Sequence, residues 1–268
     1  MLETCTVTTF SEFWGAIEAS VRGFSGEFLW WRGQARADWS VTPSLYHKCR
    51  AELETDMIVR FINRARPRYS RPPETNDIRS WLLLMQHHGL PTRLLDWSES
   101  PLVALFFAVR EGEHLAHPGV LWALSPALLN KSQGKSDRIL GVSDSAVLPL
   151  WEAAVGRVTS GDTDKIFAIA ADHFDVRHMV QSCECTIHGT HKPLNLLPDA
   201  ANYLRRIEIP AEFKQSFLTY LAYMGITESY LFPDLDHLAK DVQRLPFVKQ
   251  PKPDSAPDHA RKNTNTSD

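Results

Sequence analysis

WLLLMQHHGLPTRLLDWSESPLVALFFAV, residues 81–109, predicts two apolar helices joined by a short polar segment. The first helix is expected to end at Gly89, because glycine adopts a left-handed cap without a Cβ penalty. Pro91 favours an extended segment after that cap. Ser100 as N-cap and Pro101 in the first turn predict where the second helix begins.

Five polar side chains lie between these helices within eleven residues: His88, Thr92, Arg93, Asp96 and Ser98. Polar groups this close to a core must be hydrogen-bonded or take part in function. In a purely structural interpretation His88 caps its helix, and Arg93 pairs with Asp96 across a turn. The hydroxyl of Ser98 is either a second turn group or free to act elsewhere, because Ser100 supplies the better cap.

The composition indicates a globular protein. A chain of 268 residues, 43% hydrophobic and 10% aromatic, is long enough for one large domain with a sizeable core. The formal net charge of −3 argues against a nucleic-acid-binding surface spread over the whole protein. Four cysteines in a chain of this length indicate reduced thiols. Because the sequence has no apolar run of about 18 residues and no basic-then-apolar leader, we expect a cytoplasmic protein without a membrane span.

Helical and strand patterns alternate irregularly, which predicts an α+β fold. We expect a single domain over residues 1–246, with a small mixed or split β-sheet flanked by helices. The almost apolar-free residues 247–268 predict a disordered tail. Residues 130–165 are polar and contain glycine, so we expect mostly loop there. The sequence has no P-loop, Gly-rich dinucleotide turn, nucleophile elbow or His-Glu-x-x-His pair, which leaves those enzyme classes without support.

The first predicted strand ends in Trp31-Arg32-Gly33-Gln34. An arginine followed by glycine is suited to hold a phosphate or carboxylate that approaches the backbone closely. The structural alternative is a guanidinium that stacks on a tryptophan or pairs with an acid.

A compact cysteine and histidine pattern comprises Cys183, Cys185, His188 and His191. Zinc would need all four side chains to converge on one point. The spacing is tighter than in usual structural sites, and cysteines also serve as small core residues. We therefore assign no metal, while the pattern leaves the alternative open.

Three segments resemble the FRG domain family, which is named for an aromatic-Arg-Gly motif and is found mostly in bacteria and phages. They are Trp31-Arg32-Gly33, residues 86–98 with the Phe106-Phe107-Ala108 that follows, and residues 231–236. The resemblance covers about residues 10–245. The family usually has a Gln-x-Gly-x-Phe segment; here Gln181 is kept, whereas Cys183 and Cys185 replace the glycine and phenylalanine.

The order of motifs is more distantly similar to the Arg-Ser-Glu plan of ADP-ribosyltransferases. That similarity implies that Arg32 holds a phosphate or ribose of NAD, Ser98 orients the nicotinamide ribose, and Gln181 replaces the catalytic glutamate. Glutamine binds a ribose hydroxyl but lacks the charge that stabilises an oxocarbenium-like centre. Glu184 is the nearby carboxylate, although it should face the other side of its strand. We expect the first three residues to share one cleft.

The polar neighbours of these motifs are further candidates for contacting NAD: Gly33, Gln34, His88, Thr92, Arg93 and Asp96. The resemblance favours an NAD-binding ADP-ribosyltransferase-like enzyme that modifies an unidentified macromolecule or hydrolyses NAD, in a toxin or phage-defence setting. The missing glutamate motivates an alternative, a non-catalytic module that binds a nucleotide or an acidic peptide. A third hypothesis, a nucleic-acid enzyme, has slight support from an arginine run that is usually only a solvated surface: Arg64, Arg66, Arg68 and Arg71.

Overall fold

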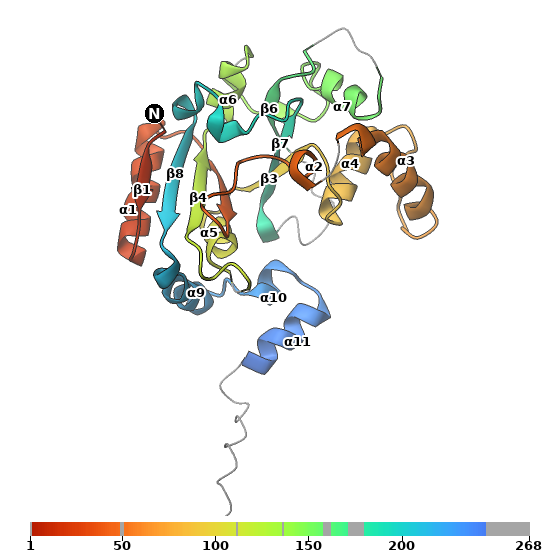
Figure 1. The fold of residues 1–268 in the computed structure, drawn as a ribbon. Helices are drawn as coiled ribbons and strands as arrows, with labels where there is room; N and C mark the ends of the chain where they lie inside the picture. The colour runs from red at the N-terminus through yellow and green to blue at the C-terminus, as the bar shows by residue number, and fades with distance from the viewer. Residues whose placement is uncertain are drawn as a thin grey trace, which may run out of the picture.

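A computed structural model describes residues 2–48, 51–110, 112–135, 137–157, 162–170 and 180–244. One eight-stranded sheet runs through them in the order β1-β8-β4-β2-β3-β7-β6-β5 (Figure 1). The strands are β1 (Thr4–Thr6), β2 (Trp30–Gln34), β3 (Leu94–Ser98), β4 (Gly119–Leu124), β5 (Leu140–Gly141), β6 (Ile166–Ala170), β7 (Cys183–His188) and β8 (Leu204–Ile209). The β1–β8 and β5–β6 pairs are parallel and the other pairs antiparallel. The sheet is mixed, as predicted, but larger than expected.

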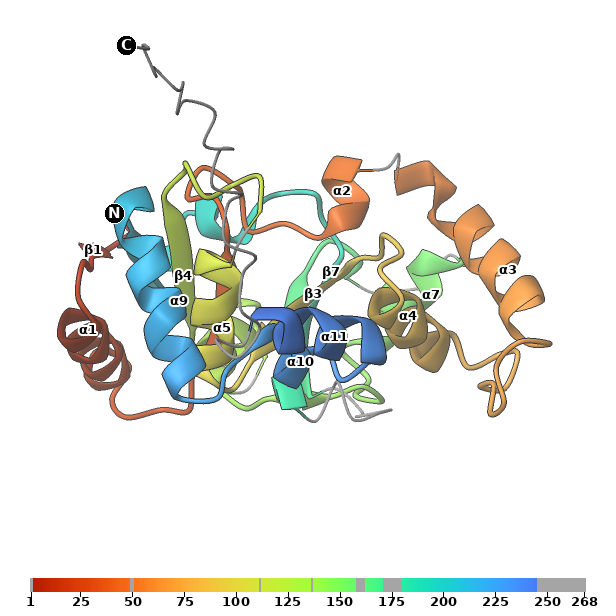
Figure 2. The ribbon, with the colours of Figure 1, turned by 90° about the horizontal axis from the view of Figure 1, so that it is seen from below.

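Two groups of helices pack on this sheet, one toward each end (Figure 2). One group is α1 (Phe10–Gly23), α5 (Pro101–Val109) and α9 (Lys214–Tyr223); the other is α3 (Glu54–Ala65), α4 (Ile78–His87) and α7 (Leu148–Ala154). Short helices complete the described fold: α2 (Ser44–Lys48), α6 (Pro126–Ser132), α10 (Glu228–Leu231), α11 (Leu235–Arg244), and 3₁₀ turns at Ala51–Leu53, Leu194–Leu196, Ala200–Asn202 and Ala211–Phe213.

The two helix groups lie on the same face of the sheet. Trp31 and Ser98 stand opposite each other in the antiparallel β2–β3 pair, so their side chains share a face. Trp31 belongs to the core beneath the first group, and Leu94, on the same face of β3 as Ser98, belongs to the core beneath the second. Each half of the sheet therefore has its own core on that face.

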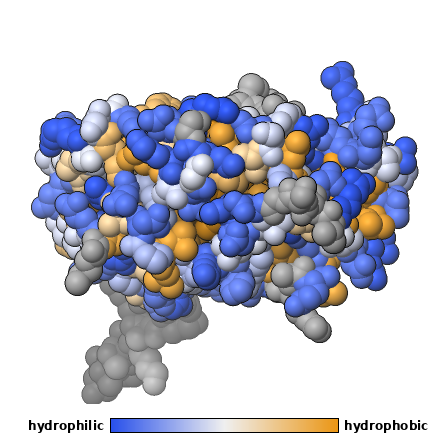
Figure 3. Space-filling view, turned by 90° about the horizontal axis from the view of Figure 1, so that it is seen from above, coloured by the Kyte–Doolittle hydropathy of each residue, from blue (hydrophilic) through white to orange (hydrophobic). Residues whose placement is uncertain are grey.

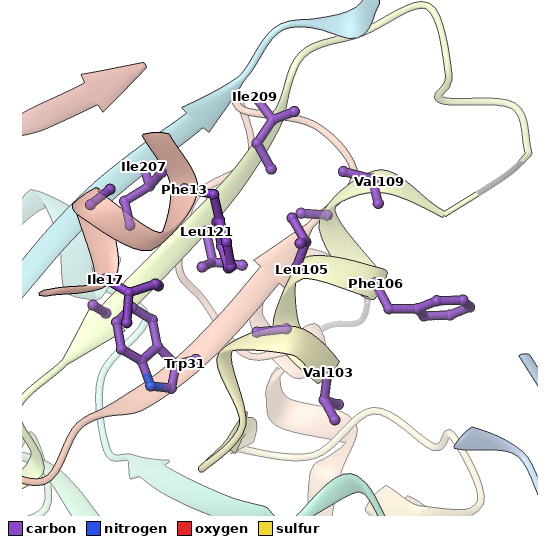
Figure 4. Close-up of a cluster of buried hydrophobic side chains, with 14 of the residues drawn as sticks. Phe13, Ile17, Trp31, Val103, Leu105, Phe106, Val109, Leu121, Ile207 and Ile209 are labelled. Atoms are coloured by element: carbon purple, nitrogen blue, oxygen red, sulfur yellow. The ribbon is translucent and has the colours of Figure 1, made fainter. Parts of the chain in front are cut away.

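The core of the first half is built from residues of successive elements (Figure 4). Phe13 from α1, Trp31 from β2, Leu105 from α5 and Leu121 from β4 are all buried together. The other face of the sheet carries a third core rich in aromatic rings: Trp30, Trp97, Trp122 and Tyr203. The centre of the sheet is thus buried on both faces. From above, the surface is mostly hydrophilic, with hydrophobic residues showing between the hydrophilic ones (Figure 3).

The central segment folds as its sequence predicts. Gly89 follows α4 with a φ of 76°, in the left-handed region. The hydroxyl of Ser100 accepts a hydrogen bond from the Val103 amide, and α5 begins at Pro101. Local capping chemistry therefore fixes both ends of the link that carries β3.

Other expectations have mixed outcomes. The described part of residues 130–165 is mostly loop, as expected, although the short β5 and α7 lie within it. The apolar run of β6, Ile166–Ala170, pairs with β7 and was not predicted as a strand. The tail expected over 247–268 lies outside the described residues, and the domain extent 1–246 stays a prediction. In the described ranges, every helix is too short or too polar to cross a membrane.

Candidate functional site

A cleft opens in the middle of the sheet, between β2 and β3. Strand β2 pairs with β4 along all of its residues but with β3 at one position only, Trp31 opposite Ser98. Beyond that pair the two strands separate. A cavity of about 810 Å³ occupies this region, and its lining includes residues 31–34 of β2, Ala35 after that strand, and residues 94–98 of β3. The strands stay in one sheet, which is mixed rather than divided in two, and we call the opening between β2 and β3 the split.

Arg32 lines this cleft. Its Nη1 donates a 2.6 Å hydrogen bond to the backbone carbonyl of Asp96, across the split. Its Nε is buried and has no hydrogen-bond partner among the described residues. Burial lowers the pKa of the guanidinium, and the Asp96 carboxylate opposes this effect. Because an arginine remains protonated even so, a cation with an unused donor stands in the cleft wall.

The cleft wall carries more basic than acidic groups. The cations in the lining are Arg32, Lys48 and Arg110, and the acids are Asp38 and Asp96. His47 and His191 add imidazole rings, and burial lowers the pKa of His47. Asp38 is held by two hydrogen bonds from the Arg36 guanidinium, of 2.9 and 2.6 Å. Asp96 accepts a 2.9 Å bond from Gln86 Nε2. The excess of cations favours an anionic ligand.

Aromatic surface accompanies these charges. Trp39 lines the cleft with 42% of its surface exposed and contacts the His114 ring edge-to-face at 4.9 Å. Phe107 also lines the cleft, and the guanidinium of Arg110 lies 6.0 Å from its ring centre. An exposed ring, and a half-buried ring near a cation, suit a ligand with both phosphate and a flat base.

Gly33 and Gln34, which follow Arg32 in β2, are both required by the packing of the fold. A Cβ on Gly33 would lie 1.8 Å from the Ala104 carbonyl oxygen, so the glycine is needed for the close packing of α5 on β2. Gln34 is buried; its Oε1 accepts a 2.6 Å bond from Trp122 Nε1, and its Nε2 donates to the Ser40 carbonyl at 3.1 Å. Both line the cleft, but their side-chain chemistry is already explained by the fold.

Ser98 and Gln181 line the same cleft as Arg32. The Ser98 hydroxyl donates to the Gln181 backbone carbonyl at 2.6 Å and accepts from the Ser100 amide at 3.1 Å. The Gln181 side chain donates from Nε2 to the Leu231 carbonyl at 2.9 Å and accepts from the Cys183 thiol at 3.6 Å. Three residues distant in sequence thus line one cleft, but Arg32 alternates with Trp31 along β2, so its side chain leaves the sheet on the face opposite to that of Ser98. Ser98 and Gln181 also have hydrogen bonds that hold the fold.

The structure places four candidates outside the cleft lining: His88, Thr92, Arg93 and Glu184. Thr92 is buried and donates to Gln86 Oε1 at 2.5 Å. Glu184 stands opposite Trp97 in the β3–β7 pair. Its side chain therefore points to the other face of β7 from that of Cys183, as predicted. His88 follows α4, with its ring against His87.

Arg93 forms a buried ion pair with Glu54, at 2.5 Å, and not the pair with Asp96 that the sequence suggested. Its Nη1 also donates to the Leu150 carbonyl at 3.0 Å. Burial alone would lower the pKa of Arg93, but the hydrogen bonds and charge of Glu54 outweigh it and raise the pKa. Arg93 therefore ties β3 to α3 and α7 and is removed from a ligand.

The cysteine and histidine pattern does not form a metal centre in the described chain. Cys185 points into the core beneath α4, whereas His188, three residues further along β7, points to the opposite face. No group of three or more potential ligands converges within the described ranges. Burial, with a smaller effect of the Arg32 charge, lowers the pKa of His188 to about 3, so this imidazole is neutral.

Sequence reasoning missed several cleft residues: Trp39, Thr42, His47, Lys48 and Arg110. Most come from the loop and short helix after β2, which the sequence marks only by Pro43. A signal was nevertheless present, because a tryptophan and two basic residues within fifteen positions after Gly33 are unusual for a plain turn.

The fold and cleft define a mixed α/β protein with a basic site at a split in its sheet. Residues 27–116 match the family model of the FRG domain, so the chain carries an FRG domain over about a third of its length. This match contains Arg32, the central segment and α5. No curated protein and no solved structure matches the chain.

Proposed function

We propose that the cleft binds NAD and that the protein is an ADP-ribosyltransferase-like enzyme. The observation that carries the proposal is the Arg32 guanidinium, which bridges the split, keeps an unused Nε donor and stands among further cations. A guanidinium in this setting is suited to the pyrophosphate of a dinucleotide. The exposed Trp39 ring offers a surface for a base or nicotinamide.

The reaction requires a carboxylate, and Asp96 is the best placed. It lines the cleft, is exposed, and lies close enough to Arg32 to influence its pKa. When the bond between nicotinamide and ribose breaks, nicotinamide leaves with the electron pair and the ribose carbon gains positive charge. An oxygen of water or of an acceptor then bonds to that carbon and loses its proton. A carboxylate stabilises this charge, which the Gln181 amide does not.

A second candidate is a nucleotide-binding module without turnover. It is favoured by the hydrogen bonds of Gln181 and Ser98, because both side chains would have to leave their partners to act on a substrate. The two candidates share the same ligand and differ in whether nicotinamide is released. The arginines considered for nucleic-acid binding do not line the cleft; Arg68 instead donates to the Arg64 carbonyl at 2.5 Å.

The test combines NAD binding, by calorimetry and thermal shift, with chromatography of released nicotinamide. At a ligand concentration 100 times Kd, binding stabilises the protein by about 2.7 kcal/mol, a readily measured shift. We expect Arg32→Ala to abolish binding and Asp96→Asn to bind NAD without releasing nicotinamide. Arg22→Ala, on the exposed side of α1, is the control.

Each result decides between the candidates. Binding with nicotinamide release that requires Asp96 supports the enzyme. Binding that requires Arg32, with no release by the wild-type protein, supports the module. Absence of any NAD binding by the wild-type protein refutes both.

A further inference from the structure

A second cavity, of about 650 Å³, lies between α5, α9, α10 and α11, which are neighbours at the lower side of the molecule (Figure 2). We call it the side groove; it is lined by Phe106, Glu113, Leu218, Ala222, Ile226 and Phe232, among others. Ala35 and Arg110 line both the side groove and the cleft. The two cavities therefore meet at these residues.

The junction between the cavities is firmly held. Lys214, fully buried in the first turn of α9, donates from Nζ to the Ala35 carbonyl at 2.7 Å and to the His114 carbonyl at 3.1 Å. Phe107 of the cleft and Phe232 of the side groove meet edge-to-face at 6.1 Å. A ligand in one cavity would therefore lie beside a fixed wall of the other.

The walls of the side groove are apolar and its rim is acidic. Phe106, Leu218, Ile226 and Phe232 form the apolar part, and Tyr223 at the edge is 84% exposed. The carboxylates come from Glu113, Glu228 and Asp241, against one guanidinium, Arg110, at the junction.

The rim carboxylates differ in their exposure and in their partners. The Glu113 side chain is 86% exposed and lies 3.2 Å from His114 Nε2, and Glu228 lies 3.7 Å from His237 Nε2. Asp241 accepts a 2.9 Å hydrogen bond from the Ser229 amide. A negative rim repels the phosphates of a nucleic acid and attracts lysine or arginine. An apolar interior beside such a rim suits a large side chain next to a basic residue.

We propose that the side groove binds a polypeptide segment in which an apolar side chain adjoins a lysine or arginine. The assignment of this segment as the acceptor for ADP-ribose rests on the proposed function, because the side groove opens beside the cleft that would hold NAD. Binding of the segment itself does not depend on NAD. The macromolecular partner is thus a basic polypeptide and not a nucleic acid.

The test measures fluorescence anisotropy of a short labelled peptide of leucine, arginine and serine with the full chain. A peptide with glutamate in place of arginine and a single-stranded DNA oligonucleotide are the comparison probes. Two exposed positions are changed, Glu113→Lys and Ala222→Arg, each alone and together. The controls carry the same charge changes elsewhere: Glu18→Lys on α1 and Ser216→Arg, an exposed position of α9 outside the side groove.

We expect the double variant to weaken binding of the basic peptide about tenfold or more and the controls to change it less than about twofold. Hydrogen exchange should show peptide-dependent protection in α9 and α10. The proposal is overturned if the side-groove variants bind the peptide like the controls, or if the DNA binds more tightly than the basic peptide.

The experiment distinguishes a wrong assignment of the side groove from a wrong assignment of NAD binding to the cleft. Arg32→Ala should lose NAD and keep the peptide, whereas the double variant should lose the peptide and keep NAD. Loss of NAD in both variants would show that the side groove is not a separate site.

Discussion

The Arg32 guanidinium donates a 2.6 Å hydrogen bond to the Asp96 carbonyl across the opening between β2 and β3. The strands are paired by their backbones only at Trp31 and Ser98, so this side chain continues the connection where pairing stops. The same guanidinium lines the cleft. A structural and a ligand-binding role therefore coincide in one residue, and variants must be chosen to separate them.

Arg32→Lys keeps the charge but replaces a planar fork with a compact ammonium. A lysine here cannot both bond the Asp96 carbonyl and clamp a pyrophosphate, so we expect NAD affinity to fall about tenfold or more. The lost hydrogen bond should cost about 1 kcal/mol in the free energy of unfolding. Calorimetry and urea unfolding measure the two effects. Unchanged affinity would show that charge alone suffices.

Gly33→Ala should destabilise the protein by about 3 kcal/mol, because the new Cβ overpacks against α5. The added atom would lie 1.8 Å from the Ala104 carbonyl oxygen and 2.6 Å from the Ala108 amide nitrogen, both backbone atoms. Gly15→Ala is the matched control: in α1, with no atom within 4 Å of its Cβ, it should stabilise by about 0.5–1 kcal/mol. Urea unfolding of both variants checks the difference in sign.

Gln181→Ala removes the donor that satisfies the Leu231 carbonyl. We expect a loss of about 1–3 kcal/mol in the stability with which α10 docks, seen as faster hydrogen exchange in α10, with NAD affinity unchanged. Gln181→Glu should be more disruptive, because a carboxylate would face that carbonyl. Normal exchange in α10, together with loss of nicotinamide release, would instead identify Gln181 as catalytic.

His188 makes stability depend on pH. Its pKa is about 3 in the folded protein and about 6.5 when unfolded. Between these values the unfolded chain binds more protons, so stability falls as the pH decreases from about 6.5 toward 3, by up to about 1.4 kcal/mol per pH unit from this group. His188→Gln removes the titration, and urea unfolding over this pH range should show a shallower slope. An equal slope in the variant would contradict this assignment.

The sequence predicted the central segment because its signals are local. Apolar periodicity, the cap at Gly89 and the Ser100-Pro101 start each act within one turn of chain. The joint lining of one cleft by Arg32, Ser98 and Gln181 was expected from motif order, and all three line it. Motif order does not reveal that Arg32 and Ser98 point to opposite faces of the sheet.

The partners of polar groups could not be predicted in the same way. Arg93 pairs with Glu54 and Gln181 bonds Leu231, contacts that only the tertiary fold creates. The short run of β6 has no alternation, since both faces of this strand are buried even though it lies next to the edge strand β5. The metal pattern, in contrast, fails on a rule visible in the sequence: residues 185 and 188 of one strand face opposite ways.

The single backbone pairing between β2 and β3 also bears on cooperativity. Each half of the sheet has its own helices and its own core on the helical face, and the shared aromatic layer behind them is the main apolar link. Calorimetry should therefore show a van't Hoff enthalpy below the calorimetric one, because the halves melt as coupled but distinct units. Nucleotide bound across the split would act as a crosslink and bring the two enthalpies together.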